Sequence, residues 1–367
     1  MIFSRTEEFF RMFHPKTHES GSIILRREFG KSYKQSQIST IDLERFSRHA
    51  VGLNDVFFST SAFLGQPLLL NFSHTSCLHL QVPKAEWNTN IILTLRLENL
   101  GIPLPTATLF DGTHLTLLWI IDSPIKSHEF YIYTMLQRAL YEASKEFNPT
   151  ASNLDVALTI RMVGSINSKS KQLVGLVNDY GKTYGRRFLQ DAILKTNRMS
   201  PAETFNMQTQ AGTVLELMAL LGERWFLASQ YPELFSDWII FVGASLSNFC
   251  TPSQLRIELS AVAESLEGLP WKKISDKYEN LILSIINTAK DGYIDFEGVH
   301  LPINEPNWRD LISGKLSVTT DEQKYLNLQV LGNQASISPH LHLVNKSQRT
   351  IGHTDFIPAD TLLLRTA

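Results

Sequence analysis

The sequence has few cysteines and no long apolar run. Its 367 residues include two cysteines, Cys77 and Cys250. Two thiols cannot build the disulfide framework of a small secreted domain, so we expect a reducing, cytoplasmic environment. The longest apolar runs, such as 115–121 and 238–244, are much shorter than the roughly 20 residues that span a bilayer. Two glutamates precede any sustained apolar run, which argues against a secretory signal. We therefore expect no membrane association.

The sequence also shows no internal repeat and no low-complexity tract. Hydrophobic residues make up 43% of the chain and charged residues 19%, which is enough apolar surface for a sizeable core. The formal net charge of −2 hides an uneven distribution, because residues 161–198 contain eight Lys and Arg against two Asp. A smaller basic stretch covers residues 25–34. Basic stretches of this kind indicate either a phosphate-facing surface or a solvated lysine-rich loop.

The pattern of apolar residues changes near residue 200. Before that point, runs of alternating apolar and polar residues predict short strands. These runs are 55–59, 76–82, 91–97, 107–110, 115–121 and 172–177. An apolar stripe over 128–147 predicts a helix, and 88–100 fits a helical spacing as well as a strand. Strands interleaved with helices predict an α+β fold for this half.

After residue 200 the pattern is helical. Candidate capping sequences begin at Ser200, Thr251 and Thr320, and the segments 236–249 and 275–290 also read as helices. We expect a bundle of five or six helices. The predicted organisation is an N-terminal arm (1–50), an α+β core (51–198), a helical bundle (199–335) and a C-terminal tail (336–367).

The order of four segments in the core resembles a known family. The segments are 54–63, 77–81, 105–119 and 155–169, and the strongest match is Arg161-Met-Val-Gly-Ser-Ile-Asn-Ser-Lys169. This series resembles the RepB-like branch of the archaeo-eukaryotic primase superfamily, the replication primases of plasmids and other mobile elements. The resemblance covers roughly residues 50–335. It implies an RRM-like primase core followed by an all-α bundle, and a protein that works on DNA.

The catalytic residues of that family are not retained at the matching positions. Such primases use two divalent ions held by carboxylates to join nucleotides. Where the family has a strand with Asp-x-Asp, this chain has His79 and Gln81. The position of the family's nucleotide-contacting histidine is occupied by Thr116, and His114 lies two residues earlier. The position of the family's third acid is occupied by Asp155. We therefore expect no catalytic residues, no metal site and no cofactor; Mg²⁺ is implied only if the protein is an active DNA primase.

The basic stretch supplies the candidate nucleic-acid contacts. Its Gly-Ser-Ile-Asn-Ser-Lys run places backbone and hydroxyl donors beside ammonium groups, a combination that suits phosphates. The candidate residues are Arg161, Ser165, Asn167, Lys169, Lys171, Lys182, Arg186 and Arg187. Two other interpretations stay open. Asp155 is either a remnant metal ligand or a helix N-cap or ion-pair partner of Arg161. The residues His74, Cys77 and His79 fit ordinary strand side chains better than zinc ligands.

These features predict a nucleic-acid-binding protein derived from a mobile-element replication primase. We expect it to be catalytically inactive and to act in DNA replication or recombination as a DNA-binding or scaffolding subunit, with the bundle recruiting a protein partner. One alternative is an active primase that initiates plasmid replication. Another is a protein-interaction module of a recombination or defence complex that makes no DNA contact.

Overall fold

The computed structural model describes most of the chain between residues 21 and 331. The described residues are 21–30, 32–39, 42, 46, 49–86, 88–179, 181–196, 200–224, 235–267, 276–296, 299–302, 312–314 and 316–331. Contacts divide the chain into two units, Met1–Pro201 and Ala202–Ala367. The predicted tail at 336–367 lies outside the described residues. The α+β class with a helical C-terminal region, predicted from the sequence, is confirmed.

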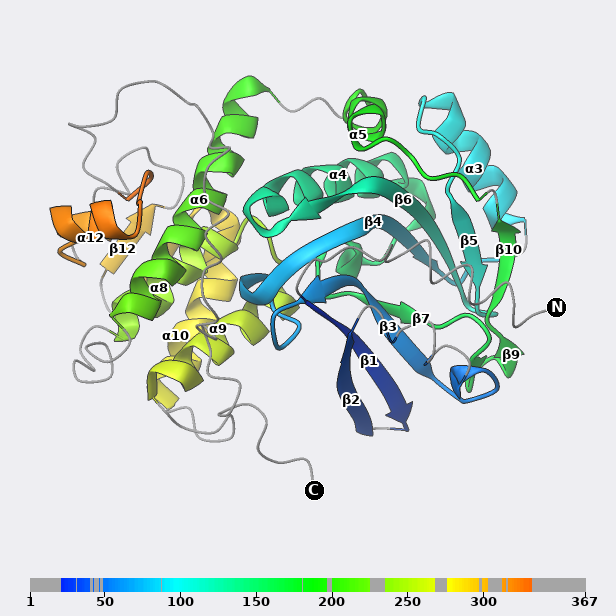
Figure 1. Ribbon diagram of the computed structural model, residues 1–367, viewed down its shortest axis with the longest axis horizontal. Coiled ribbons are helices and arrows are strands. Elements are labelled where there is room, and N and C mark those ends of the chain that lie inside the picture. The colour runs from blue at the N-terminus through cyan, green and yellow to red at the C-terminus, as the bar shows by residue number, and fades with distance from the viewer. Residues whose placement is uncertain are drawn as a thin grey trace. The chain divides into compact units, whose positions relative to one another are not determined.

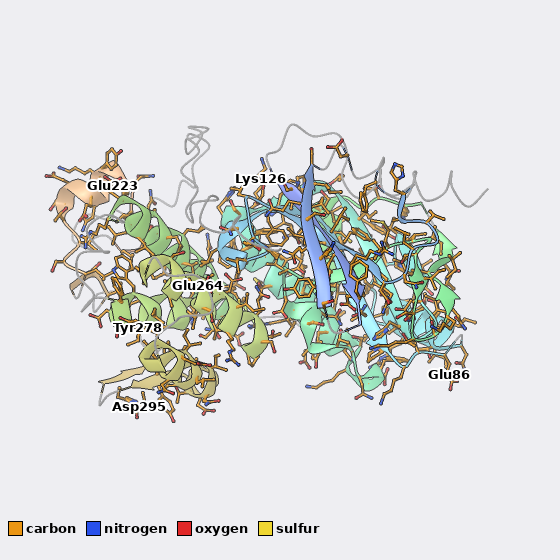
Figure 2. All side chains as sticks on the ribbon, turned by 90° about the horizontal axis from the view of Figure 1, so that it is seen from below. Glu86, Lys126, Glu223, Glu264, Tyr278 and Asp295 are labelled. Atoms are coloured by element: carbon orange, nitrogen blue, oxygen red, sulfur yellow. The ribbon has the colours of Figure 1, made fainter. Side chains whose placement is uncertain are left out.

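The first unit is built on an antiparallel sheet (Figure 1). Its order is β10-β5-β6-β4-β3-β1-β2, and β7 also pairs with β3. The strands are β1 (Ser22–Phe29), β2 (Ser32–Ser39), β3 (Val56–Phe63), β4 (Phe72–Pro83), β5 (Ala107–Phe110), β6 (His114–Lys126), β7 (Thr159–Arg161) and β10 (Gly175–Asp179). The short strands β8 (Ile166–Asn167) and β9 (Gln172–Leu173) form a separate pair. Lys126, labelled in Figure 2, marks the end of β6.

The strand pair β4 and β6 forms the centre of this sheet. Nine of the twelve residues of β4 and all of residues 115–121 of β6 are buried, on both faces of the sheet, which explains why this part of β6 reads as a continuous apolar run rather than an alternating one. One cluster of buried residues takes members from β1, β3, β4, β5, β6 and β7 and includes Val56, Phe58 and Ile160. The core of the unit is therefore shared by strands that are distant in the sequence.

The N-terminal strands correct one expectation. Residues 22–39 form the hairpin β1–β2, and β1 pairs with β3 from Ser22 opposite Phe63 to Arg27 opposite Val56. This segment therefore belongs to the sheet of the core and not to a separate arm that ends at residue 50. Local periodicity offers little sign of it, because β2 has hardly any apolar residue.

The helices of the first unit correct a second expectation. Residues 91–97 lie in α3 (Thr89–Asn99), so the strand interpretation of this run is wrong and the helical alternative is right. Leu93 and Leu97, one helical turn apart, are the buried pair. The expected helix at 128–147 is α4 (Phe130–Ala143), flanked by the 3₁₀ turns η3 (Ser127–Glu129) and η4 (Lys145–Phe147). Helix α5 (Arg186–Leu194) and the turns η2 (Leu69–Asn71) and η5 (Ala151–Leu154) complete the unit.

The second unit is mainly helical. Its elements are α6 (Pro201–Glu223), α8 (Phe235–Leu246), α9 (Pro252–Glu267), α10 (Asp276–Thr288), η8 (Ala289–Asp291), the hairpin β11 (Tyr293–Phe296) and β12 (Val299–Pro302), and α12 (Thr320–Tyr325). Glu264 and Tyr278, labelled in Figure 2, lie on α9 and α10, which pack on each other. No helix in the described part of either unit has the length and apolar character needed to cross a membrane.

Two predicted helix starts in this unit can be compared with the structure. The Thr251 hydroxyl accepts a hydrogen bond from the Gln254 N–H at 3.3 Å, as expected at the start of α9. At α12 the capping residue is Thr319, whose hydroxyl accepts from the Glu322 N–H at 3.2 Å. The predicted box at Thr320 is therefore one residue out of register, because two adjacent threonines offer the same signal.

Candidate nucleic-acid interface and primase-like centre

His79 stands where the primases that the motif order resembles have their first aspartate, and it lies in the core of the sheet. Its side chain is fully buried, its Nδ1 lies 3.5 Å from the Thr60 hydroxyl, and its ring lies 6.4 Å from that of Tyr133 on α4. The other ring nitrogen, Nε2, has no hydrogen-bond partner. Burial lowers the pKa of His79 to about 3, so the imidazole is neutral at physiological pH.

Gln81 and Thr116 lie beside His79 on the same strand pair. They are direct cross-strand partners on β4 and β6, and Gln81 shares its sheet face with His79 because side chains alternate along a strand. The backbone of Gln81 is fixed by Asn153, whose Oδ1 accepts from the Gln81 N–H at 2.8 Å. The aligned positions therefore present a neutral imidazole, an amide and a hydroxyl.

This donor set does not fit a pair of magnesium ions. Magnesium requires hard oxygen ligands, chiefly carboxylates, and the aligned strand positions contribute none. Asp155, 8% exposed, follows the 3₁₀ turn η5 as its C-cap, so its interpretation as a helix N-cap is wrong. Among the described residues, no cluster of three His, Cys, Asp or Glu side chains is arranged to hold a metal ion.

The charged centre of the unit is Arg161 on β7. Its guanidinium forms ion pairs with Asp55, just before β3, and with Asp111, at 2.9 Å in the turn between β5 and β6. The side chains of all three residues are about one-tenth exposed or less. The guanidinium also lies over the Phe57 ring, 4.5 Å from its centroid. Arg161 is therefore paired with two carboxylates that the sequence interpretation did not connect with it.

The turn that carries Asp111 is held by the residues around it. One Asp111 carboxylate oxygen accepts from the N–H groups of Thr113 (2.8 Å) and His114 (2.7 Å). Gly112 takes a left-handed φ of 86°, and a Cβ there would lie 2.6 Å from the Ser170 hydroxyl oxygen. Only glycine fits this turn without displacing Ser170.

Both acids of this centre are ionised. Burial alone would raise the pKa of Asp111, but hydrogen bonds from His114 and Thr113 outweigh it and hold the pKa well below its usual value. Burial likewise opposes ionisation of Asp55, and hydrogen bonds from Ser168 together with Arg161 lower its pKa on balance. The centre therefore contains one cation and two anions, tightly hydrogen-bonded.

The segment 165–171 is fixed to this centre. The Asn167 amide donates to the Asp111 carbonyl and the Thr113 hydroxyl, both at 3.0 Å. Ser165 is buried and its hydroxyl donates to the Met162 carbonyl at 2.7 Å. The side chains of Ser165 and Asn167 thus form hydrogen bonds within the unit. They fix the loop on which Lys169 and Lys171 are exposed.

The remaining predicted contacts lie near α5. Arg186 forms a bidentate ion pair with Glu129, with both N–O distances 2.8 Å. Lys182 and Arg187 are exposed, and the Lys182 ammonium lies 5.2 Å from the centre of the Tyr184 ring. Of the eight predicted residues, Lys169, Lys171, Lys182 and Arg187 therefore face solvent, while Arg161 and Arg186 are paired with carboxylates.

Comparison with known proteins gives a limited set of similarities. No protein-family model matches the chain. A curated "Replication protein" from Clostridium perfringens is 33% identical over 96 residues, which is 26% of this chain and 23% of that protein. Part of this chain is similar to a replication protein. The match spans about a quarter of the relative's length.

Three solved structures are also similar. The AEP domain of the cyanophage S-2L primase-polymerase aligns at 12% identity and a TM-score of 0.40, over 52% of this chain and 97% of that domain. The primase RepB′ aligns at 12% identity and a TM-score of 0.36, over 86% of this chain and 99% of that protein. The catalytic domain of RepB′ in complex with initiator DNA aligns at 12% identity and a TM-score of 0.35, over 57% of this chain and 94% of that domain. The curated relative is a replication protein, which agrees with the replication role that the motif order suggests.

Proposed function

We propose that this chain is a nucleic-acid-binding replication protein whose primase-like core does not polymerise nucleotides. One observation carries the proposal: the two strand positions that match the catalytic aspartates hold the buried, neutral His79 and Gln81, and Thr116 stands where the family has its histidine. In-line attack on an α-phosphate needs divalent ions to stabilise the attacking and leaving oxygens. A face without carboxylates supplies no ligands for them. The match to a replication protein supports a role in replication.

The other acids of the unit support the same proposal. Asp55 and Asp111 are buried acids that form ion pairs with Arg161, and both also accept hydrogen bonds from backbone N–H groups. A carboxylate that is already neutralised by an arginine has little left to offer a metal ion. We expect the chain to bind no Mg²⁺ for catalysis.

The test of inactivity is primer synthesis and extension with labelled nucleotides and Mg²⁺ or Mn²⁺. We expect no template-dependent product from the purified protein, alongside an active primase as positive control. Template-dependent products that disappear in the Asp155→Ala variant would overturn the proposal and favour an active primase.

The test of nucleic-acid binding uses the loop lysines. Replacing Lys169 and Lys171 with glutamine removes two exposed charges, so the slope of log affinity against log salt should fall by about 0.7 to 0.9 for each phosphate that is no longer neutralised. Lys324→Gln, exposed on α12, is the control and should leave the slope unchanged. Binding by the double variant equal to that of the parent would show that the loop is only a solvated surface.

The role of the helical unit is part of the same proposal. Its described surface exposes large apolar side chains on different helices, including Phe205, Leu215 and Ile257. Such side chains suit recruitment of a protein partner in replication or recombination of a mobile element. Co-purification of a defined partner with the full chain, abolished when these residues are replaced by serine, would support this role.

A further inference from the structure

The β1–β2 hairpin concentrates positive charge without using it in the centre described above. Residues 22–39 contain four Lys and Arg, at positions 26, 27, 31 and 34, against the single acid Glu28. That acid pairs with Arg26 at 2.8 Å. The hairpin lies at the end of the sheet, and β2 is the edge strand (Figure 1).

The β2 strand contributes little to the core. Seven of its eight residues are exposed, and Ile38 is the one that packs partly against the core. Because this strand buries so little side-chain surface, packing against the core does not dictate which residues it contains. Its exposed side chains, Lys34 among them, are therefore accessible to contacts outside the chain.

One face of the hairpin places two cations directly opposite each other. Arg27 on β1 and Lys34 on β2 are cross-strand partners in the register. Like charges in this position repel, because the two Cβ atoms of such a pair are about 5 Å apart. The structure shows no ion pair for either residue among the described side chains, and the Arg27 Nε is buried without a hydrogen-bond partner. The pair therefore lacks the anion that would neutralise it.

An exposed aromatic ring completes this face. Phe29, two residues along β1, shares the face with Arg27 and is 46% exposed. The Arg27 guanidinium lies 4.9 Å from the centre of the ring and orients it. Tyr33 is 61% exposed as well, but it lies on the opposite face, where it is paired in register with Glu28.

We propose that this face of the hairpin, made of Arg27, Phe29 and Lys34, binds single-stranded nucleic acid. A backbone phosphate lies between Arg27 and Lys34, and the adjacent base stacks on Phe29. The proposal rests on the proposed function and adds a second contact surface, separate from the 161–198 stretch. A single strand fits better than a duplex, because only unpaired bases offer a free face to an aromatic ring.

The experiment measures binding of the full chain to a labelled oligothymidylate of about 20 nucleotides and to a duplex of the same length. Phe29→Ala should weaken single-strand binding about fivefold or more, the range expected for loss of one stacked base, and Phe29→Tyr should restore it. Arg27→Gln and Lys34→Gln should each lower the salt slope by about 0.7. Duplex affinity should change little with Phe29→Ala.

Tyr33→Ala is the matched control, since it removes an exposed ring from the same hairpin on the other face. Unchanged binding by this variant supports the proposal. Equal losses for Phe29→Ala and Tyr33→Ala, or equal losses on duplex and single strand, would overturn it. If the parent chain binds the oligonucleotide and every hairpin variant binds it with the same affinity, only this inference is overturned. A parent that binds no nucleic acid overturns the proposed function too.

Discussion

Arg161 stabilises the fold by neutralising two carboxylates that have little access to water. It lies 106 residues after Asp55 and 50 after Asp111, and β7 brings it to both. Burying one of these acids without a partner would be costly, because a desolvated charge keeps little of its hydration energy. The arginine is therefore expected to matter for stability before it matters for any ligand.

We expect Arg161→Met to lower the free energy of unfolding by about 3 to 5 kcal/mol, the cost of leaving buried acids unpaired. Arg256→Met is the control: Arg256 pairs with Glu279 at 3.0 Å, but both side chains are 54% exposed, and such pairs contribute about 1 kcal/mol or less. Urea unfolding at pH 7 measures both. Equal, small losses would show that the buried centre contributes no more than a surface ion pair.

The pH dependence of this effect has a defined sign. The pKa values of Asp55 and Asp111 are lowered in the fold, so their contribution is present above the pKa of the unfolded acids, about 4, and is lost as the pH falls below it. The difference in stability between the parent and Arg161→Met should therefore shrink on acidification below pH 4. A difference that grows there would contradict the assignment.

His79 gives a second prediction at the residue scale. Its pKa is about 3 in the fold and about 6.5 in the unfolded chain, so the unfolded state takes up a proton first as the pH falls. Between pH 7 and pH 5 this single group should cost about 2 kcal/mol of stability. His79→Gln removes the titration, so its unfolding free energy should change less over this interval. Parallel pH profiles would show that the imidazole is solvated.

At the scale of elements, the sequence predicted what local periodicity encodes. Alternating or continuous apolar runs located β3, β4 and β6, and the cap at Thr251 located α9. Such signals are short-range, so they do not predict an element whose structure is determined by contacts with distant parts of the chain. The run 91–97 is a helix in which Leu93 and Leu97 lie on the buried face. The strand β2 has no apolar pattern to predict it, because its residues face water.

The candidate site was predictable only in part for the same reason. The motif 161–169 located Arg161 and the loop lysines, but spacing could not tell which side chains are used within the fold. Asp55 and Asp111 gave one weak signal each, a polar residue beside a strand and an Asp-Gly turn. The meeting of Asp55 with Arg161 depends on the pairing of β7 with β3, and Asp111 reaches Arg161 from the turn between β5 and β6. No local pattern encodes either contact.

A carboxylate on α6 fixes the end of the described chain. The Glu216 side chain accepts hydrogen bonds from the N–H groups of Val330 (2.8 Å) and Leu331 (2.7 Å), and also from Gln329. Successive N–H groups converging on one anion form a strong local contact. Gly212, one helical turn earlier, leaves room for Val330, since a Cβ there would lie 2.8 Å from its methyl carbon.

We expect Glu216→Gln to release this contact, because an amide offers one acceptor oxygen instead of two. The free energy of unfolding should fall by about 1.5 to 3 kcal/mol, the range for hydrogen bonds to a charged group. Hydrogen exchange at the amides of residues 329–331 should accelerate. Glu223→Gln, exposed on the same helix and labelled in Figure 2, is the control and should change neither quantity. Unchanged exchange in Glu216→Gln would contradict the contact.

At the scale of the whole chain, the two units differ in charge and in contact order. The sheet of the first unit pairs strands from residue 22 to residue 179, so it requires the whole of that segment. The second unit is made mainly of helices whose hydrogen bonds are local. The exposed lysines at 169 and 171 and the β1–β2 hairpin both belong to the first unit. Nucleic-acid binding and helical packing are therefore assigned to different parts of the sequence.

This division predicts that the second unit folds by itself. Its buried residues lie on α6, α8, α9 and α10, among them Leu217, Trp238, Leu259 and Ile285, each at most 1% exposed, and α8, α9 and α10 pack on one another. A fragment of residues 200–336 should be soluble, helical by circular dichroism and cooperative in thermal melting. It should also lose most nucleic-acid affinity, because it lacks both proposed contact surfaces. A fragment that is unfolded would place the boundary elsewhere, and one that keeps the full affinity would place the binding surface on the helices.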